Sequence, residues 1–334
     1  MTKLHEAEII NKTLVKLPLN NRIYMNNKKI TFALVLALLF AGTAFSQQKI
    51  YDEHVFVYKV VQGYEIKANI FVPKTGRRHP VYIYFHGGGF IFGNRDNGLP
   101  DALRDKLIEH DYAVVSADYR LAPETKLAGI TDDVRDVVNW IRENGAKQFQ
   151  IDENKIAVSG GSAGGYLAIT AGYNVNPPVQ AIVEISAPTG FTSMSTQMGD
   201  TSILKQPGPY DIVKDPIVSY GDYSTRVDLW RFLSKNRLGL YEIFGFDVTQ
   251  DSVRLQNYTL SNHIKKGYPP TLIVHAKNDH LVDFLQAEKF YNLLQEKGVE
   301  SELFTVENGH SEEVINNYPE VVDKIIKFLD ARLR

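Results

Sequence analysis

Short apolar runs alternate with amphipathic stretches along most of the chain beyond residue 52. Residues 55–60 form a largely apolar run and residues 64–72 alternate between polar and apolar positions, and together they predict an antiparallel hairpin. Further apolar runs have the length of buried strands: 81–85, 113–117, 155–159, 181–185, 271–275 and 302–306. Helical patterns lie between or after them, at 99–110, 132–144 and 311–332. Strands that alternate with helices predict an α/β fold with a mostly parallel central sheet flanked by helices.

The alternation stops between residues 189 and 268, which separate two predicted strands by more than the short connections usual in α/β domains. We interpret 189–268 as a cap insertion. It is rich in large apolar side chains: Phe191, Met194, Met198, Tyr210, Tyr220, Tyr223, Trp230, Phe232, Tyr241, Phe244 and Phe246. Such groups can cover a substrate pocket or fill the cap's own small core, and for any single residue we favour the second role.

The N-terminal region has a different pattern. Two lysines precede an apolar run at 30–41, and Ala44 and Ser46 then supply small residues before a polar stretch. This order is typical of a secretory signal peptide. The apolar run is shorter than the roughly 20 residues that span a bilayer, which favours a cleaved signal over an uncleaved membrane anchor, the alternative.

These features set the predicted boundaries of the chain. Met25 stands just before the lysines, so residues 1–24 are interpreted as an upstream extension from a misplaced start. Residues 25–46 are the predicted signal peptide, and 47–334 the mature α/β domain with its cap. We therefore expect a periplasmic or secreted protein with no stable membrane span after cleavage.

Composition removes several classes of function. The formal net charge is -2 and the basic residues form no stripe, so a nucleic-acid partner is not expected. The chain contains no cysteine, which excludes disulfides, thiolate metal sites and a cysteine nucleophile. Its histidines and carboxylates lack metal-ligand spacing such as H-E-x-x-H, so no metal site is predicted. The sequence leaves the oligomeric state open.

Ser162 lies in Gly160-Gly161-Ser162-Ala163-Gly164, between the apolar run 155–159 and the small-residue stretch 165–171. A strand, a tight turn and a helix with a serine at the apex is the nucleophile elbow of a serine hydrolase. The glycines allow strand and helix to approach closely, so the hydroxyl projects at the top of the sheet. Glycine and serine can also simply mark a loop.

The segment His86-Gly87-Gly88-Gly89-Phe90 directly follows a predicted strand. Acyl transfer develops an oxyanion, and consecutive glycines let backbone N–H groups point toward it. The residue after the nucleophile, Ala163, supplies another N–H. We interpret His86 as a structural hydrogen-bonding residue, because it precedes the nucleophile and belongs to this loop.

A serine needs a base to remove its proton and an acid to orient that base. In a fold of this kind, the acid and then the histidine follow the serine in the chain. Asp279 lies just beyond the predicted strand 271–275, and His310 lies between the last strand and the last helix. Both positions fall at the sheet edge where Ser162 is expected, although Asp279 can also be read as a helix N-cap.

Together these segments resemble the α/β-hydrolase superfamily, and within it the hormone-sensitive-lipase-like esterases (α/β hydrolase fold-3). The resemblance spans roughly residues 55–330 and rests on three motifs: 86–90, Asp118-Tyr119-Arg120-Leu121-Ala122-Pro123-Glu124 and 160–165. It implies that the N–H groups of Gly88 and Gly89 join Ala163 in the oxyanion hole. It also implies structural ion pairs at Asp118, Arg120 and Glu124.

Two departures from that family bear on substrate. Many relatives have an N-terminal cap helix, whereas here the region holds the predicted signal peptide. Relatives often show Asp-Pro-Leu-x-Asp around the acid, whereas this chain has Lys277-Asn278-Asp279-His280-Leu281, closer to secreted carbohydrate-esterase and peptidase-like hydrolases.

The sequence thus predicts a secreted or periplasmic serine carboxylic-ester hydrolase that needs no cofactor. Ser162 is the nucleophile, His310 the base and Asp279 its orienting acid. Its substrates are expected to be small-molecule or glycan esters, such as short-chain, acetylated or feruloylated compounds. The alternatives are a serine peptidase or lactonase on the same fold, and a non-catalytic binding protein that retains the fold.

Overall fold

The computed structural model describes residues 49–191 and 197–334. The predicted upstream extension at 1–24 and signal peptide at 25–46 lie outside the described residues. Within the described residues, every helix is too short or too polar to span a bilayer.

The described residues form an eight-stranded sheet with the order β1-β2-β4-β3-β5-β6-β7-β8. β2 is antiparallel to both of its neighbours, and every other pair is parallel. The strands are β1 (Tyr51–Val61), β2 (Tyr64–Pro73), β3 (His79–Phe85), β4 (Ala113–Ala117), β5 (Ile151–Gly161), β6 (Ala181–Ile185), β7 (Thr271–Asn278) and β8 (Ser301–Asn308). The predicted α/β fold with a mostly parallel sheet is confirmed.

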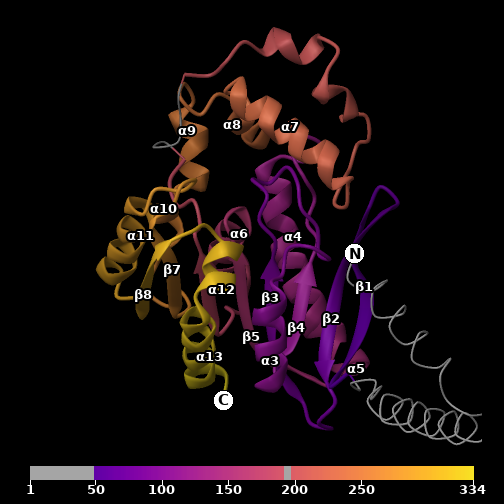
Figure 1. Cartoon of the computed structure of the whole chain (residues 1–334), viewed down its shortest axis with the longest axis vertical. Helices are drawn as coiled ribbons and strands as arrows, with labels where there is room; N and C mark the ends of the chain where they lie inside the picture. Colours follow the sequence, from indigo (N-terminus) through magenta and orange to yellow (C-terminus); the bar gives the residue numbers. More distant parts are fainter. Residues whose placement is uncertain (1–48, 192–196) are drawn as a thin grey trace, which may run out of the picture. The chain divides into compact units, whose positions relative to one another are not determined.

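Helices cover both faces of the sheet (Figure 1). One face carries α4 (Leu127–Trp140), α6 (Ala163–Asn174) and α11 (Leu285–Glu296). The other carries α3 (Asp101–Glu109), α12 (Glu312–Asn317) and α13 (Pro319–Leu333). Because both faces are covered, the parallel strands are apolar almost throughout, which explains why their sequences read as continuous hydrophobic runs.

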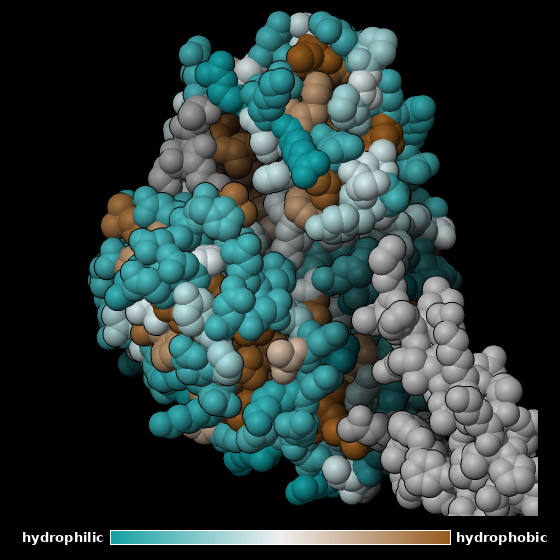
Figure 2. Space-filling model, viewed as in Figure 1, coloured by the Kyte–Doolittle hydropathy of each residue, from teal (hydrophilic) through white to brown (hydrophobic). Residues whose placement is uncertain are grey.

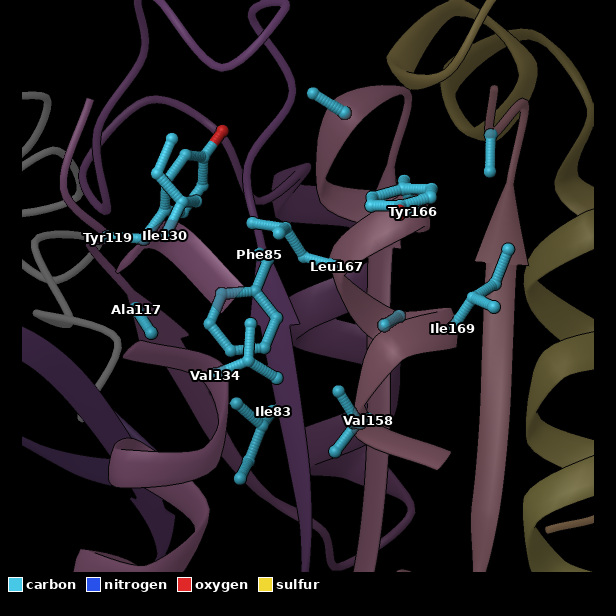
Figure 3. Close-up of a cluster of buried hydrophobic side chains, with 14 of the residues drawn as sticks. Ile83, Phe85, Ala117, Tyr119, Ile130, Val134, Val158, Tyr166, Leu167 and Ile169 are labelled. Carbon is cyan, nitrogen blue, oxygen red and sulfur yellow. The ribbon is translucent and has the colours of Figure 1, made fainter. Parts of the chain in front are cut away.

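Strand β3 shows how one strand serves both layers. Successive side chains of a strand point to opposite faces. Ile83 and Phe85 therefore join the core beneath α4 and α6, which Figure 3 shows in close-up, whereas Tyr82 and Tyr84 join the core beneath α3 and α13. All four side chains are fully buried, so this central strand holds the two layers together.

Two helix boundaries differ from the sequence prediction. The single helix expected at 311–332 is two helices, α12 and α13, with the break at Tyr318. Pro319 takes the first position of α13, where its missing N–H costs nothing, and it cannot continue the preceding helix. The helix expected at 132–144 begins earlier, at Leu127, and continues beyond Trp140 as a π-helical turn, Ile141–Gly145, and a short α5 (Ala146–Gln148).

The chain between β6 and β7 forms the insertion that the sequence analysis interpreted as a cap. Its helices lie beyond one end of the sheet in Figure 1. They are the short η2 (Thr201–Lys205), η3 (Pro209–Ile212), α7 (Tyr223–Lys235), α8 (Gly239–Phe244), α9 (Ser252–Leu255), η4 (Gln256–Tyr258) and α10 (Leu260–His263). Phe244 packs edge-on against Phe191 and Tyr258, with ring centres 4.9 Å apart in each pair, so part of the aromatic content fills the insertion's own core.

Buried ion pairs connect these layers. Arg226 of α7 pairs with Glu124 at 2.6 Å, and both side chains are almost fully buried. Arg120 bonds to the buried Asp133 of α4, and Asp118 bonds to Arg95. The three charged residues of the 118–124 motif therefore all lie in ion pairs, and Glu124 connects the insertion to the body of the domain.

Candidate active site

Ser162 sits between the end of β5 and the start of α6 with φ 54° and ψ -121°. A positive φ is costly for any residue with a side chain, so the surrounding structure must hold it. The Ser162 N–H donates to the carbonyl of Ile185 at 2.8 Å, and its own carbonyl accepts from Tyr166 at 3.2 Å. The serine is thus held in a strained turn, half-buried at the carboxyl end of the sheet.

Neighbouring glycines make this turn possible. A Cβ at Gly160 would lie 2.3 Å from the backbone of Gly164, and one at Gly164 would lie 2.0 Å from the carbonyl oxygen of Phe85. Real Cβ atoms do not approach backbone so closely, so only glycine fits at either position. The elbow predicted from the pattern of glycines around Ser162 is therefore built on backbone contacts between strand and helix.

The loop after β3 has the backbone expected of an oxyanion hole. Gly88 has φ +103° and Gly89 has φ +57°, which favour glycine. Tyr119 fixes the start of the loop, because its hydroxyl donates to the carbonyls of His86 and Gly87 at 3.0 and 3.1 Å. Across residues 49–191 and 197–334, no acceptor takes a hydrogen bond from the N–H groups of Gly88, Gly89 or Ala163.

His86 is buried and supports this loop. Its ring stacks on Tyr119 with centres 4.2 Å apart, and its Nδ1 lies 2.7 Å from the carbonyl oxygen of Gly87. Burial lowers the pKa of His86 to about 4, although the contact with Gly87 acts in the opposite direction. The imidazole is therefore neutral at neutral pH, which suits the structural role predicted for it.

Asp279 and His310 meet although they are 31 positions apart in the chain. His310 Nδ1 lies 2.7 Å from Asp279 Oδ2, and the side chain of Asp279 is fully buried. The other carboxylate oxygen accepts from the N–H groups of Leu281 and Val282 at 2.8 and 2.9 Å. This contact leaves the Nε2 atom of His310 available to the cavity.

The charge of Asp279 is stabilised by these bonds. Burial has the largest single influence on its pKa and raises it, but the hydrogen bonds from His310, Val282 and Leu281 and the electrostatic attraction to His310 together outweigh burial. The pKa of Asp279 therefore lies below its ordinary value, and the group is a carboxylate at neutral pH. The bonds to Leu281 and Val282 resemble those of a cap, but the next helix, α11, begins only at Leu285.

Ser162, Ala163, Gly88, Gly89 and His310 all line one cavity of about 670 Å³. No hydrogen bond joins Ser162 to His310 in the described part of the chain. The insertion forms the opposite wall of the cavity with Phe191, Met198, Tyr223, Trp230, Leu240, Tyr241 and Ile243. Figure 2 shows hydrophobic atoms, in brown, in the hollow between these helices at the top and the rest of the domain.

The cavity wall contacts the oxyanion loop through Trp230. The Nε1 atom of Trp230 lies 2.9 Å from the position that a Cβ would take at Gly89. Phe92 connects the same loop to the insertion, because its ring packs edge-on against Tyr223 and Trp230 at 5.6 and 5.7 Å. The site thus combines a strained serine, a histidine bonded to a carboxylate, unpaired backbone donors and an apolar wall.

Comparison with protein families assigns most of the chain to a known group. The BD-FAE family model matches residues 68–294. The chain belongs to the BD-FAE family. The predictions of the α/β-hydrolase superfamily and of an esterase-type hydrolase domain are thereby confirmed for the matched residues 68–294. The narrower assignment to the hormone-sensitive-lipase-like group remains a prediction.

The curated relatives of this BD-FAE family member are much larger proteins, and the chain matches one segment of each. It is 27% identical over 299 residues to the non-reducing polyketide synthase Preu6 of Preussia isomera, covering 78% of this chain and 14% of that protein. It is 28% identical over 297 residues to the non-reducing polyketide synthase atr1 of Stereocaulon alpinum, covering 76% of this chain and 12% of that protein. The matched region is thus a small part of either synthase.

Solved structures show the same fold. A structure of an esterase from Rhizomucor miehei superimposes with a TM-score of 0.62 at 22% identity, covering 85% of this chain and 84% of that one. A hyperthermophilic esterase from the archaeon Pyrobaculum calidifontis superimposes with a TM-score of 0.60 at 24% identity, covering 88% of this chain and 87% of that one. At these identities the likeness concerns the fold of the BD-FAE domain.

Several residues that support the site were not singled out from the sequence. Ser311, next to His310, has φ 51°, and its N–H donates to the hydroxyl of Ser186, which itself has φ 53°. The Nε2–H of His275 in β7 donates to the carbonyl of Val282, 2.9 Å away, and so supports the acid loop. The sequence signal for the contact between Ser311 and Ser186 was limited to serines that recur after predicted strands. The signal for the contact of His275 was limited to a histidine within an apolar run.

Glu184 is the other group that sequence reasoning passed over. It is fully buried in β6, where one carboxylate oxygen accepts from the Ala187 N–H at 2.9 Å and the other has no partner among the described residues. Burial raises the pKa of Glu184 to about 8; the bond from Ala187 opposes this rise and the nearby charge of Asp279 adds to it. A lone acidic residue in the run 181–185 was the available signal.

The described residues contain no group of three or more histidine, aspartate or glutamate side chains arranged to hold a metal ion.

Proposed function

We propose that this protein is a serine carboxylic-ester hydrolase in which Ser162, His310 and Asp279 act as a triad. The observation that carries the proposal is the 2.7 Å contact between Asp279 and His310, because it orients the imidazole on the wall of the cavity that also holds Ser162. The carboxylate holds one tautomer of the ring and stabilises the imidazolium that forms during reaction.

The acylation step follows from this arrangement. His310 Nε2 takes the hydroxyl proton of Ser162 as Oγ forms a bond to the carbonyl carbon of the ester. The carbonyl electron pair moves to oxygen, where the N–H groups of Gly88, Gly89 and Ala163 hold the negative charge. The bond to the alcohol then breaks, and His310 returns its proton to the leaving oxygen.

Deacylation repeats the sequence with water. His310 removes a proton from water as the water oxygen bonds to the carbonyl carbon of the acyl-enzyme. The bond from that carbon to Ser162 Oγ then breaks, His310 returns the proton to Oγ, and the acid is released. Each backbone donor of the oxyanion hole contributes on the order of 3 kcal/mol to such a transition state. No cofactor takes part in these steps.

The proposed substrates are esters of short acyl groups or acylated glycans. The cavity of about 670 Å³ has room for more than an acetyl group, and its wall is largely apolar and aromatic. The proposed location is the periplasm or the exterior of the cell, on the strength of the predicted signal peptide. N-terminal sequencing of the exported protein tests this location. A chain that begins at residue 47 would support it, whereas a chain that keeps residues 25–46 would contradict it.

Hydrolysis of p-nitrophenyl acetate, butyrate and octanoate by residues 47–334 tests the enzymatic part of the proposal. We expect turnover of the short esters and its loss in Ser162→Ala, by about 10³-fold or more, with an unchanged circular dichroism spectrum. A folded protein without activity on any ester, but with activity on peptides or lactones, would support the alternative hydrolases instead. Equal activity in Ser162→Ala would rule out the serine mechanism.

A further inference from the structure

Two consecutive glutamates, Glu312 and Glu313, follow the histidine loop and line the active-site cavity. Their surroundings differ. Glu313 has a structural contact, because its Oε2 accepts from the N–H of His310 at 3.2 Å. Glu312 is half-buried, yet within residues 49–191 and 197–334 no donor hydrogen-bonds to its carboxylate and no cation pairs with it. Its carboxylate is therefore free to bind a group in the cavity.

The carboxylate of Glu312 stands beside the reacting centre. The position that a Cβ would take at Gly87 lies 3.5 Å from Glu312 Oε1 and 3.4 Å from the Cβ of Ser162. The two side chains thus flank the same glycine of the oxyanion loop. Burial, and next the charge of Glu312, raise the pKa values of Tyr84 and Tyr119 well above their ordinary range, so this charge is felt in the interior.

A carboxylate at this place is unfavourable for the chemistry alone. A negative charge next to an oxyanion hole opposes the negative charge that develops on the substrate oxygen. A half-buried carboxylate without partners has also lost part of its hydration. Both costs are offset when hydrogen-bond donors of a bound molecule contact the carboxylate, because hydrogen bonds to a charged acceptor are the strong ones.

We propose that Glu312 is a specificity-determining residue that accepts hydrogen bonds from free hydroxyl groups in the alcohol part of the ester, and so selects partially acylated sugars over esters of simple alcohols. The inference rests on the proposed function. Hydroxyl groups both donate and accept, and they suit the remaining polar lining, which carries both signs of charge and includes Asn97, Ser234, Arg237, Asp247, Thr249 and Glu313.

The test compares Glu312→Gln with the unmutated enzyme on matched substrates. The first is a monoacetate of methyl xyloside with its other hydroxyls free, the second is the same monoacetate with those hydroxyls O-methylated, and the third is p-nitrophenyl acetate. Glutamine preserves shape and removes the charge. We expect kcat/KM on the free xyloside acetate to fall about 10- to 100-fold, chiefly through KM, because hydrogen bonds to a charged group contribute about 1.5–3 kcal/mol.

On the O-methylated acetate and on p-nitrophenyl acetate, the same variant should keep or exceed the unmutated kcat/KM. Glu320→Gln is the matched control, since Glu320 is exposed in the first turn of α13 and lies outside the cavity lining. It should leave all three substrates unchanged. Glu312→Ala, checked by thermal unfolding, serves as a second variant and should show the same discrimination.

Equal loss on all three substrates, or no loss on any, would overturn the assignment of Glu312. A larger loss on acetylthiocholine than on the xyloside acetate would overturn it in favour of a cation-binding carboxylate. Activity on p-nitrophenyl acetate with none on the xyloside acetate would overturn the sugar inference while the serine mechanism stood. Failure of the serine mechanism is detected separately, by Ser162→Ala on p-nitrophenyl acetate.

Discussion

The contact between Asp279 and His310 determines what the imidazole can do. Asp279 accepts three hydrogen bonds, from the side chain of His310 and from the backbone of Leu281 and Val282. The two backbone bonds hold the carboxylate in place whether or not histidine is bound to it. The acid is therefore rigid, and it orients the histidine rather than following it.

Replacement of Asp279 by asparagine tests this role. Asparagine retains an oxygen for the N–H groups of Leu281 and Val282, but it favours the wrong tautomer of His310 and removes the charge that stabilises the imidazolium. We expect kcat on p-nitrophenyl acetate to fall by about 10³- to 10⁴-fold, with a small change in the midpoint of thermal unfolding. An Asp279→Asn enzyme with full activity would show that another residue is the acid.

The residues of the site differ in how far the sequence could identify them. Ser162, Asp279 and His310 follow strands whose carboxyl ends meet at one edge of a parallel sheet, so order along the chain predicted their proximity. Glu184 and Glu312 offered no such signal, because a single acidic residue in a strand or at a helix start has many uses. Their importance depends on burial and on missing partners, which only the folded arrangement supplies.

The strands of the sheet were predictable from the sequence where helices bury both of their faces. The runs at 81–85 and 181–185 are apolar because helices cover both faces of the sheet. The break between α12 and α13 was missed because a continuous amphipathic pattern crosses Tyr318, and the proline that causes the break also tolerates a helix start. The packing of α7 on the body could not be predicted, since Glu124 and Arg226 are 102 residues apart.

The buried ion pair between Arg226 and Glu124 anchors α7 to the body of the domain. Arg226 bonds to Glu124 and also donates to the carbonyl of Ile91 at 2.8 Å. We expect Arg226→Met to lower the free energy of unfolding by about 3–5 kcal/mol, because it leaves the charge of Glu124 buried without a partner. The double variant with Glu124→Gln should recover part of the loss. Urea unfolding of both single variants and the double variant measures the coupling.

The exposed pair Arg231 and Asp228 on the same helix is the control. Arg231→Ala should change the free energy of unfolding by no more than about 1 kcal/mol, because solvent screens exposed pairs. Losses of equal size for Arg226→Met and Arg231→Ala would contradict a special role for the buried pair.

At the scale of the whole molecule, the proposed catalytic residues lie at the carboxyl edge of the sheet, and the ionisable side chain of Glu184 is buried in its interior. Glu184 has a folded-state pKa of about 8, above its ordinary value of 4.5. Between these values the folded protein retains a proton that the unfolded chain has released. The contribution of Glu184 to stability is therefore fully present below about pH 4.5 and is lost as the pH rises through about 8.

Glu184→Gln should remove this dependence. We expect its free energy of unfolding to match that of the unmutated protein near pH 5 and to exceed it near pH 9 by on the order of a few kcal/mol. Urea unfolding at the two pH values, with the exposed Glu320→Gln as reference, measures the difference. Parallel behaviour of the unmutated protein and Glu184→Gln across this range would contradict the assignment.

The contact of Trp230 with Gly89 has an optical consequence. The chain has two tryptophans, and the other, Trp140, stacks on Phe56 with ring centres 4.1 Å apart, outside the cavity lining. Indole emission depends on its immediate surroundings, so a molecule that enters the cavity changes the light emitted by Trp230 and leaves that of Trp140 as an internal reference. Helix α7, on the cavity wall beside the oxyanion loop, thus carries a built-in fluorescent reporter, and occupancy of the site can be followed without any label.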